Sequence, residues 1–249
     1  MAGNDTDRQW EQWGLRDPYF GVLSQPQYRS GAIARNREQF FASGRTHIDG
    51  IMRDRKRLYP AGNSRRALDF GCGVGRLAIP LAEHFERLFA VDISEAMLQE
   101  TACNCAEFGV TNVTTALFDS ELSNLPGSFD FVHSLIVLQH LPLSRGLHII
   151  AALISRLSPA GVAALHVPIE SGRNWAKQAV YTIKSRVPGS RYAFNLLQGK
   201  DLHEPFMQVN PYPLNSIVRV YRNAGLSDIW FQAIDEEPLG VICWASKAP

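Results

Sequence analysis

The stretch Ala67-Leu68-Asp69-Phe70-Gly71-Cys72-Gly73-Val74-Gly75-Arg76-Leu77 decides the fold of this chain. Residues 66–70 are predicted to form a short buried strand, because the run is mostly apolar. Glycines then stand at alternate positions, and apolar residues return from Leu77 at helical spacing. A strand, a glycine-rich turn and a helix in this order let a ligand approach backbone that lacks Cβ atoms and meet unpaired helix amides.

The spacing of these glycines narrows the class of ligand. The chain has Gly-x-Gly-x-Gly, whereas the dinucleotide fingerprint places two residues between its second and third glycines. The sequence therefore argues against a nicotinamide or flavin cofactor. Asp69 lies in the approach to the turn, where a carboxylate repels a pyrophosphate but favours the cationic amino group that S-adenosylmethionine carries.

Two further acids end the next predicted strands. Residues 87–91 lead into Asp92, which follows the glycine turn at close to the roughly 20-residue distance expected of a ribose-binding acid. Residues 112–119 end in Asp119, which is placed to meet the adenine amino group. A fourth predicted strand lies within residues 128–142 and leads into His140.

These residues together resemble the class I S-adenosylmethionine-dependent methyltransferases over roughly residues 65–165. The resemblance implies a doubly wound α/β fold with a seven-stranded, mostly parallel sheet and an antiparallel carboxy-terminal strand. It also implies S-adenosylmethionine as the cofactor and S-adenosylhomocysteine as the product. The cofactor-binding residues that it implies are Asp69, Gly71, Gly73, Gly75, Asp92, Ile93, Met97, Asp119, Ser134 and Ile136.

The chain is expected to form one domain, residues 1–249, with four parts: an amino-terminal arm, a cofactor-binding core, a lid insertion, and a carboxy-terminal helix with a hairpin, at 1–64, 65–169, 170–210 and 211–249. The arm is expected to be helical and to close over the cofactor, with residues 33–58 in two helices broken near Ser43-Gly44. Its aromatic residues either serve as lid residues or pack the arm onto the domain; they are Tyr19, Tyr28, Phe40 and Phe41.

The insertion at 170–210 is too long for a simple connection, because loops beyond about 12–15 residues are usually functional or disordered. Its segment 171–200 contains no acid, and its basic residues are Arg173, Lys177, Lys184, Arg186, Arg191 and Lys200. Part of this segment has apolar residues at helical spacing. The basic side chains form either a solvated helix face or a lid over an anionic or polyhydroxylated acceptor.

Composition limits the partners and the compartment. The chain of 249 residues, 45% of them hydrophobic, is long enough for one α/β core, and its net charge of +1 gives no general reason to expect nucleic acid or a membrane as partner. Four cysteines show no metal-type pairing, and no signal peptide or bilayer-spanning stretch is found. We expect a cytoplasmic protein that binds a small-molecule or glycan acceptor, and leave a homo-oligomer open.

Asn210-Pro211-Tyr212-Pro213 is similar to a motif of amino methyltransferases that act on nucleic-acid bases or glutamine. That motif belongs at the end of the fourth strand, where this chain has residues 135–138 with Leu-Ile-Val-Leu instead. The sequence therefore does not support a nucleic-acid acceptor.

Methyl transfer is an in-line displacement, for which a base is needed only when the acceptor holds a proton. His140 and His166 follow or end predicted strands at the ligand-binding edge of the sheet, and Glu170 lies four residues beyond His166. The three are candidate catalytic residues of an O-methyltransferase acting on a hydroxyl of a small molecule, sugar or glycan. The alternatives are an N-methyltransferase of a small amine and a non-catalytic S-adenosylmethionine-binding subunit. A divalent metal is not indicated, although His166, Glu170 and acceptor hydroxyls could form a site.

Overall fold

The structure is a computed structural model that describes residues 3–119, 122–123, 125–170, 180–183, 187, 189–197, 199, 201–202, 204–234 and 239–249. Its α-helices are α1 (Gly3–Arg16), α2 (Pro18–Val22), α3 (Ile33–Leu58), α4 (Ala78–Ala82), α5 (Glu95–Glu107), α6 (Leu143–Ser155), α8 (Ser190–Leu197) and α9 (Leu214–Asn223). Its 3-10 helices are η1 (Pro26–Tyr28) and η2 (Leu138–His140). Its strands are β1 (Arg66–Phe70), β2 (Arg87–Asp92), β3 (Val113–Leu117), β4 (Phe129–Ser134), β5 (Leu157–Pro168), β6 (Ile229–Ile234) and β7 (Gly240–Ser246).

A seven-stranded sheet in the order β3-β2-β1-β4-β5-β7-β6 forms the centre of the molecule. Strands β1 to β5 pair in parallel, whereas β7 runs antiparallel to both of its neighbours, β5 and β6. The central strands β1 and β4 are buried almost throughout, as expected of parallel strands covered on both faces. The predicted fold class, a doubly wound α/β sheet with an antiparallel carboxy-terminal strand, is confirmed.

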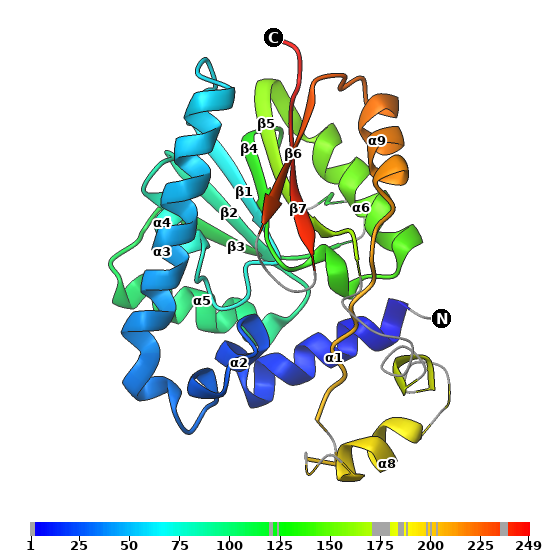
Figure 1. Ribbon diagram of the computed structural model, residues 1–249. Helices are drawn as coiled ribbons and strands as arrows, with labels where there is room; N and C mark the ends of the chain where they lie inside the picture. Colours follow the sequence, from blue (N-terminus) through cyan, green and yellow to red (C-terminus); the bar gives the residue numbers. More distant parts are fainter. Residues whose placement is uncertain are drawn as a thin grey trace.

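Helices cover both faces of the sheet, and the arm lies across its lower edge (Figure 1). On one face, α6 and α9 pack a core that includes Ile149, Leu153 and Ile217. On the other face, α3 and α4 pack a second core that includes Ile48 and Leu81. Helices α1 and α2 lie at the edge where the parallel strands end (Figure 1), which is where open α/β sheets bind ligands.

The last two strands form the expected hairpin, with Ile229 paired to Ala245 and Ile234 paired to Gly240. Residues 235–238, between the two strands, lie outside the described residues. Strand β5 begins at Leu157 and is the longest strand of the sheet. Every helix in the described part of the chain is too short or too polar to span a bilayer.

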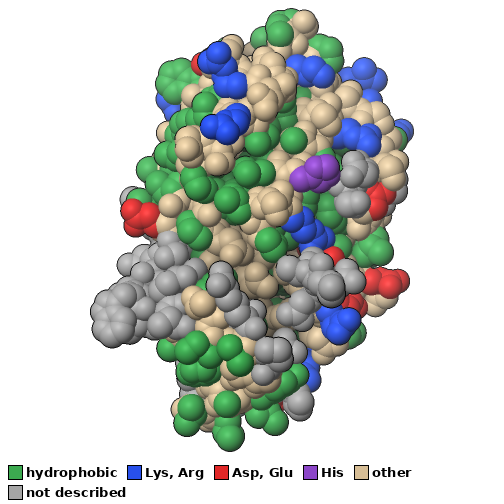
Figure 2. Space-filling model, turned by 90° about the vertical axis from the view of Figure 1, so that its right-hand side faces the viewer, with side chains coloured by type: hydrophobic (Ala, Val, Ile, Leu, Met, Phe, Trp, Pro, Cys, Tyr) green, Lys and Arg blue, Asp and Glu red, His purple; other side chains and the backbone are tan. Residues whose placement is uncertain are grey.

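The insertion contributes α8, whose apolar side chains are not covered. Leu196 is 70% exposed and Leu197 is 81% exposed, and hydrophobic side chains gather at the lower end of Figure 2, where this helix lies. Five of the six basic residues of the insertion, at positions 173, 177, 184, 186 and 200, fall outside the described residues. The two interpretations of the basic segment therefore both stay predictions.

The helix α3 corrects one expectation about the arm. Residues 33–58 form a single continuous helix, without the predicted break near Ser43-Gly44. Gly44 lies against the backbone that follows the glycine turn, and a Cβ added there would stand 2.1 Å from the carbonyl oxygen of Arg76. The glycine allows close contact between α3 and this backbone, so it marks a packing site and not the end of a helix.

We expect Gly44→Ala to lower the free energy of unfolding by about 1–3 kcal/mol, because the added methyl group overpacks the contact with Arg76. Gly50→Ala is the matched control, since Gly50 is in the same helix and a Cβ added to it would meet nothing within 4 Å. That control should gain about 0.4–1 kcal/mol through reduced freedom of the unfolded chain. Urea unfolding of both variants checks this, and equal stability of the two would contradict the packing role of Gly44.

Candidate active site

A cavity that opens to solvent lies at the carboxyl edge of the sheet. Its floor comes from the glycine turn, the end of β2 and the residue after β3, and the loop after β4 and helices α1, α2, α5 and α6 supply the walls. Residues distant in the sequence, such as Trp10, Gly73 and Ile149, meet around this one space. The cavity is therefore built by the sheet edge and the amino-terminal arm together.

The glycine turn requires its glycines. Gly71, Gly73 and Gly75 have φ angles of +76°, +55° and +86°, in the left-handed region that other residues rarely adopt. A Cβ on Gly71 would lie 2.2 Å from Cγ2 of Val137, and one on Gly73 would lie 2.4 Å from Cγ2 of Val22. Gly71 and Gly73 line the cavity, whereas Gly75 does not.

Asp92 fastens the end of β2 to this turn and lines the cavity. Its carboxylate accepts hydrogen bonds from the amide nitrogens of Gly73, at 2.9 Å, and Ser94, at 3.0 Å. Burial raises the pKa of Asp92 to about 6, although these amide donors favour the charged form. Each carboxylate oxygen carries more than one acceptor site, so Asp92 has capacity left for a ligand in the cavity.

His140 brings an imidazole to the cavity from η2, and its side chain is 7% exposed. Its Nδ1 lies 2.6 Å from the carbonyl oxygen of Gln208. A carbonyl only accepts, so Nδ1 carries the hydrogen and Nε2 holds a lone pair. The Nε2 atom lies 3.3 Å from Nε2 of Gln139, and the Trp10 ring lies 4.7 Å from the imidazole, centre to centre.

Burial lowers the pKa of His140 to about 4, and the hydrogen bond to the Gln208 carbonyl opposes this shift. At neutral pH the side chain is therefore an uncharged imidazole. Since its Nδ1 hydrogen is held by a carbonyl, the group can accept a proton at Nε2, in place of the hydrogen that the Gln139 amide donates there.

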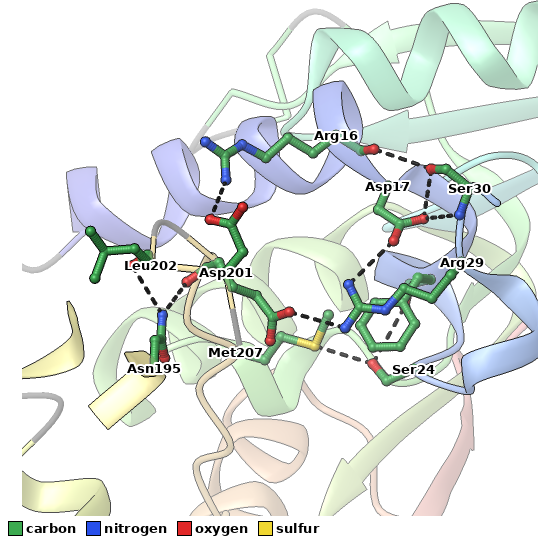
Figure 3. Close-up of polar contacts among 11 residues, drawn as sticks. Arg16, Asp17, Ser24, Arg29, Ser30, Asn195, Asp201, Leu202 and Met207 are labelled. Carbon is green, nitrogen blue, oxygen red and sulfur yellow. Dashed lines mark hydrogen bonds and ion pairs between the residues drawn. The ribbon is translucent and has the colours of Figure 1, made fainter. Parts of the chain in front are cut away.

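The arm is fastened to the segment that holds His140, as Figure 3 shows for part of this contact. Arg29 pairs with Glu204, with 3.0 Å between nitrogen and oxygen, and Arg16 lies 3.6 Å from Asp201. Further along, the Gln9 side chain accepts from the amide of Phe206 at 2.6 Å. Asp201 and residues 204–208 are thus held between the arm and η2.

A second fastening joins the arm to α6. The guanidinium of Arg145 donates to both carboxylate oxygens of Asp7, at 2.5 and 3.0 Å, and both residues line the cavity. This two-point geometry fixes orientation as well as distance.

The part of the chain that forms the cavity floor matches a known family. A family model described as "Methyltransferase domain" matches residues 67–161, the segment that holds the glycine turn, Asp92 and His140. Residues 67–161 therefore form a methyltransferase domain, as the resemblance to the class I S-adenosylmethionine-dependent methyltransferases implies. Members of this family take a methyl group from S-adenosylmethionine, which is the cofactor expected from the glycine spacing.

Curated relatives match parts of the chain. A trans-aconitate 2-methyltransferase of Deinococcus radiodurans is 34% identical over 119 residues, 47% of this chain and 43% of the relative. A magnesium-protoporphyrin O-methyltransferase of Synechocystis is 36% identical over 90 residues, 36% of this chain and 37% of the relative. A ubiquinone biosynthesis O-methyltransferase of Marinobacter nauticus is 30% identical over 165 residues, 65% of this chain and 63% of the relative. The chain therefore spans less than two thirds of each of these relatives.

Solved structures show the same fold over nearly the whole chain. The magnesium protoporphyrin IX methyltransferase from Synechocystis with bound S-adenosylmethionine has a TM-score of 0.62 at 17% identity, and the match covers 98% of both chains. An N-methyltransferase from Bradyrhizobium japonicum has a TM-score of 0.57 at 13% identity, covering 98% of this chain and 100% of that chain.

Most of the residues predicted to bind the cofactor surround the cavity. Those that line it are Gly71, Gly73, Asp92, Ile93, Met97 and Ile136. Ser134 does not line the cavity, and its hydroxyl donates instead to the carbonyl of Phe70 at 2.9 Å. Asp119 also lies outside the lining, and its carboxylate accepts from the amide and hydroxyl of Ser123, at 2.8 and 2.6 Å. The preceding residue, Phe118, is the one that reaches the cavity.

Asp69 takes a place different from the expected one. Its side chain is 2% exposed and does not line the cavity. Side chains alternate along a strand, and because Leu68 and Phe70 face α6, Asp69 faces α3. There its carboxylate lies 3.0 Å from Nδ1 of His133, whose Nε2 lies 3.4 Å from Nε2 of His47 on α3. The structure therefore places Asp69 away from the cavity, in contrast to the expectation that it faces the amino group of the cofactor.

Of the three candidate catalytic residues, His140 alone lines the cavity. His166 is on β5, between Leu165 and Val167, which pack toward α6, so its ring projects from the opposite face. Glu170 follows β5 and is exposed. Among the described residues no cluster of three His, Cys, Asp or Glu side chains could hold a metal ion.

Sequence reasoning missed the arm and α6 residues of the cavity. The expected lid residues Tyr19, Tyr28, Phe40 and Phe41 are buried in the packing of the arm, and none of them lines the cavity. The cavity is instead lined by Thr6, Asp7, Trp10, Gly21, Val22, Arg145 and Ile149. Arg145 and Ile149 stand four apart on one helix face, and this spacing is the signal in the sequence for the α6 wall.

We expect Asp92→Asn to weaken binding of S-adenosylhomocysteine about 10- to 100-fold, because hydrogen bonds to a charged group contribute roughly 1.5–3 kcal/mol. With a pKa near 6, the wild-type carboxylate becomes protonated as the pH falls, so wild-type affinity should decline between pH 7.5 and pH 5. The variant should lack this decline.

Titration calorimetry at several pH values measures both effects. Glu95→Gln is the control, since it removes the same charge from an exposed side chain at the start of α5. Affinity of Asp92→Asn equal to that of the control would refute the ligand contact of Asp92.

Proposed function

We propose that this chain is an O-methyltransferase that transfers the methyl group of S-adenosylmethionine to a hydroxyl of a small molecule, with His140 as the general base. The observation that carries the proposal is the uncharged imidazole of His140 in the cavity wall, with its Nδ1 hydrogen held by the Gln208 carbonyl. The names of the relatives from Synechocystis and Marinobacter nauticus, both O-methyltransferases, support oxygen as the acceptor atom.

Within the cavity, the cofactor would occupy the end formed by the glycine turn and Asp92. The ribose hydroxyls would donate to Asp92, and Ile93, Met97 and Phe118 would provide apolar contacts for the adenine. The acceptor would then lie between this end and the wall formed by Trp10 and His140. This division of the cavity puts the sulfonium methyl group between the two ligands.

The chemical step needs alignment and one proton acceptor. The acceptor oxygen attacks the methyl carbon in line with the breaking carbon–sulfur bond, and its proton passes to Nε2 of His140. The products are the methyl ether, S-adenosylhomocysteine and an imidazolium. Since the positive charge moves from sulfur to imidazole, the cavity holds the same net charge before and after transfer.

The low pKa of His140 indicates which kind of acceptor hydroxyl the site favours. A base with a pKa of about 4 removes a proton most effectively from a hydroxyl that is itself acidic, which favours a phenolic over a sugar hydroxyl. Apolar residues such as Trp10, Leu141 and Ile149 in the lining also suit a flat aromatic acceptor. A sugar or glycan acceptor stays the alternative, and a cytoplasmic location stays part of the proposal.

His140→Ala should lower kcat about 100-fold or more, within the range of about 10² to 10⁴ for general-base catalysis, while leaving S-adenosylhomocysteine affinity nearly unchanged. Production of S-adenosylhomocysteine from a panel of phenols, sugars and amines supplies the assay. His148→Ala, which removes an exposed histidine of α6, is the control.

His140→Gln separates packing from proton transfer, because it keeps hydrogen-bonding capacity but takes up no proton. It should be as slow as His140→Ala. Unchanged kcat in both variants would favour N-methylation of an amine. Tight cofactor binding by the wild type without turnover of any acceptor would favour a non-catalytic binding subunit.

A further inference from the structure

The loop after β4 forms one wall of the cavity and contains a strained residue. Leu135, Ile136 and Val137 line the cavity, and His140 follows on η2. Ile136 has a φ of +60°, a left-handed conformation that β-branched residues rarely adopt. Such a conformation persists only where the surroundings fix it.

His166 supplies the contact that fixes it. The amide nitrogen of Ile136 donates to Nδ1 of His166 at 3.1 Å. Because an amide only donates, Nδ1 must hold the lone pair, and the ring hydrogen is therefore on Nε2. The side chain of His166 is only 3% exposed, so water does not compete with its ring for the Ile136 amide.

Strand β7 fixes the position of the ring. A Cβ added to Gly240 would stand 2.3 Å from Nε2 of His166, so the imidazole lies directly against this backbone. Gly240 pairs with Pro168 in the antiparallel β5–β7 ladder. The ring is thus held between β7 and the loop after β4.

The conformation of Ile136 determines the position of the residues after it. Val137 packs against Gly71 of the glycine turn, where its Cγ2 lies 2.2 Å from the position of an added Cβ. The carbonyl of Val137 accepts from the amide of His140 at 3.0 Å, which begins η2. A change at Ile136 would therefore move both the wall over the glycine turn and the proposed base.

We propose that His166 is a positioning residue: its Nδ1 accepts the Ile136 amide and thereby fixes the cavity wall at residues 135–137 and the start of η2. The inference rests on the proposed function, since its consequence is measured in cofactor binding and in turnover. This role differs from that of a general base, because the ring reaches neither the cavity nor a ligand there.

The test compares two substitutions that both remove the imidazole. In His166→Asn, the side-chain oxygen occupies about the position of Nδ1 and accepts the Ile136 amide, whereas His166→Leu has no acceptor. His166→Leu should lower kcat/KM at least tenfold and raise the Kd for S-adenosylhomocysteine by a similar factor. His166→Asn should stay within about threefold of the wild type in both measurements.

Gly240→Ala gives an independent test that leaves the imidazole intact. Its methyl group would displace the ring from the Ile136 amide, so kcat/KM and S-adenosylhomocysteine affinity should again fall together. Gly50→Ala, in open space on α3, is the matched control. Calorimetry on the folded protein, checked by thermal unfolding, keeps binding separate from loss of stability.

Equal loss of turnover in His166→Asn and His166→Leu, with normal cofactor binding in both, would overturn the inference in favour of a base. Wild-type Kd and kcat in His166→Leu and Gly240→Ala would overturn it in favour of a purely structural histidine. If His166→Leu does not fold, the contrast between His166→Asn and Gly240→Ala decides. A wild-type protein that binds no S-adenosylhomocysteine would refute the proposed function instead.

Discussion

The absence of Cβ atoms at Gly71 and Gly73 is the constraint on which the site depends. Val137 and Val22 occupy the space that those atoms would fill, so the loop after β4 and the arm both rest directly on the glycine turn. The turn therefore has two roles. It exposes backbone to a ligand, and it is the surface on which two otherwise separate segments are brought to the same cavity.

Polar contacts with the segment 208–212 hold the proposed base and η2 in place. His140 is held by the carbonyl of Gln208, the side chain of Gln208 reaches Thr6 of α1 at 3.4 Å, and Tyr212 donates to the carbonyl of Leu138 at 2.8 Å. The amide of Asn210 also donates to the carbonyl of Gln139, at 2.7 Å. The segment 208–212 is thus placed beside the end of β4 in space, although it is far from it in sequence. The segment is similar to the motif of amino methyltransferases and lies at the place in the fold where that motif belongs. Its contacts, however, support η2.

The positions of the first strands along the chain and of the glycine turn could be predicted from sequence. They depend on local patterns: apolar runs, alternate glycines and terminal acids. Strand alternation places the side chain of Asp69 on the face of β1 that is covered by α3. Its position in the sequence, two residues before Gly71, instead suggests that it faces the cavity. From the sequence alone, Gly44 is expected to break the helix, because its contact with the backbone of Arg76 becomes visible only in the structure. His140 and His166 both stand near the carboxyl edge of the sheet, but His140 is in η2 and lines the cavity, whereas His166 is within β5 and projects from the face opposite to Leu165 and Val167. The arm residues that line the cavity are placed there by contacts with residues far away in the sequence. The local sequence pattern therefore does not reveal them.

The position of β7 between β5 and β6 has a consequence for biosynthesis. The ribosome supplies the glycine turn and β1 to β4 early, and the strands that pair with β1 and β2 all lie within this part of the chain. His140 and His166 acquire their partners only when Gln208 and Gly240 have been made. The nascent chain therefore builds the half of the cavity around the glycine turn well before the half that would hold the acceptor, and the complete site is among the last parts of the molecule to form.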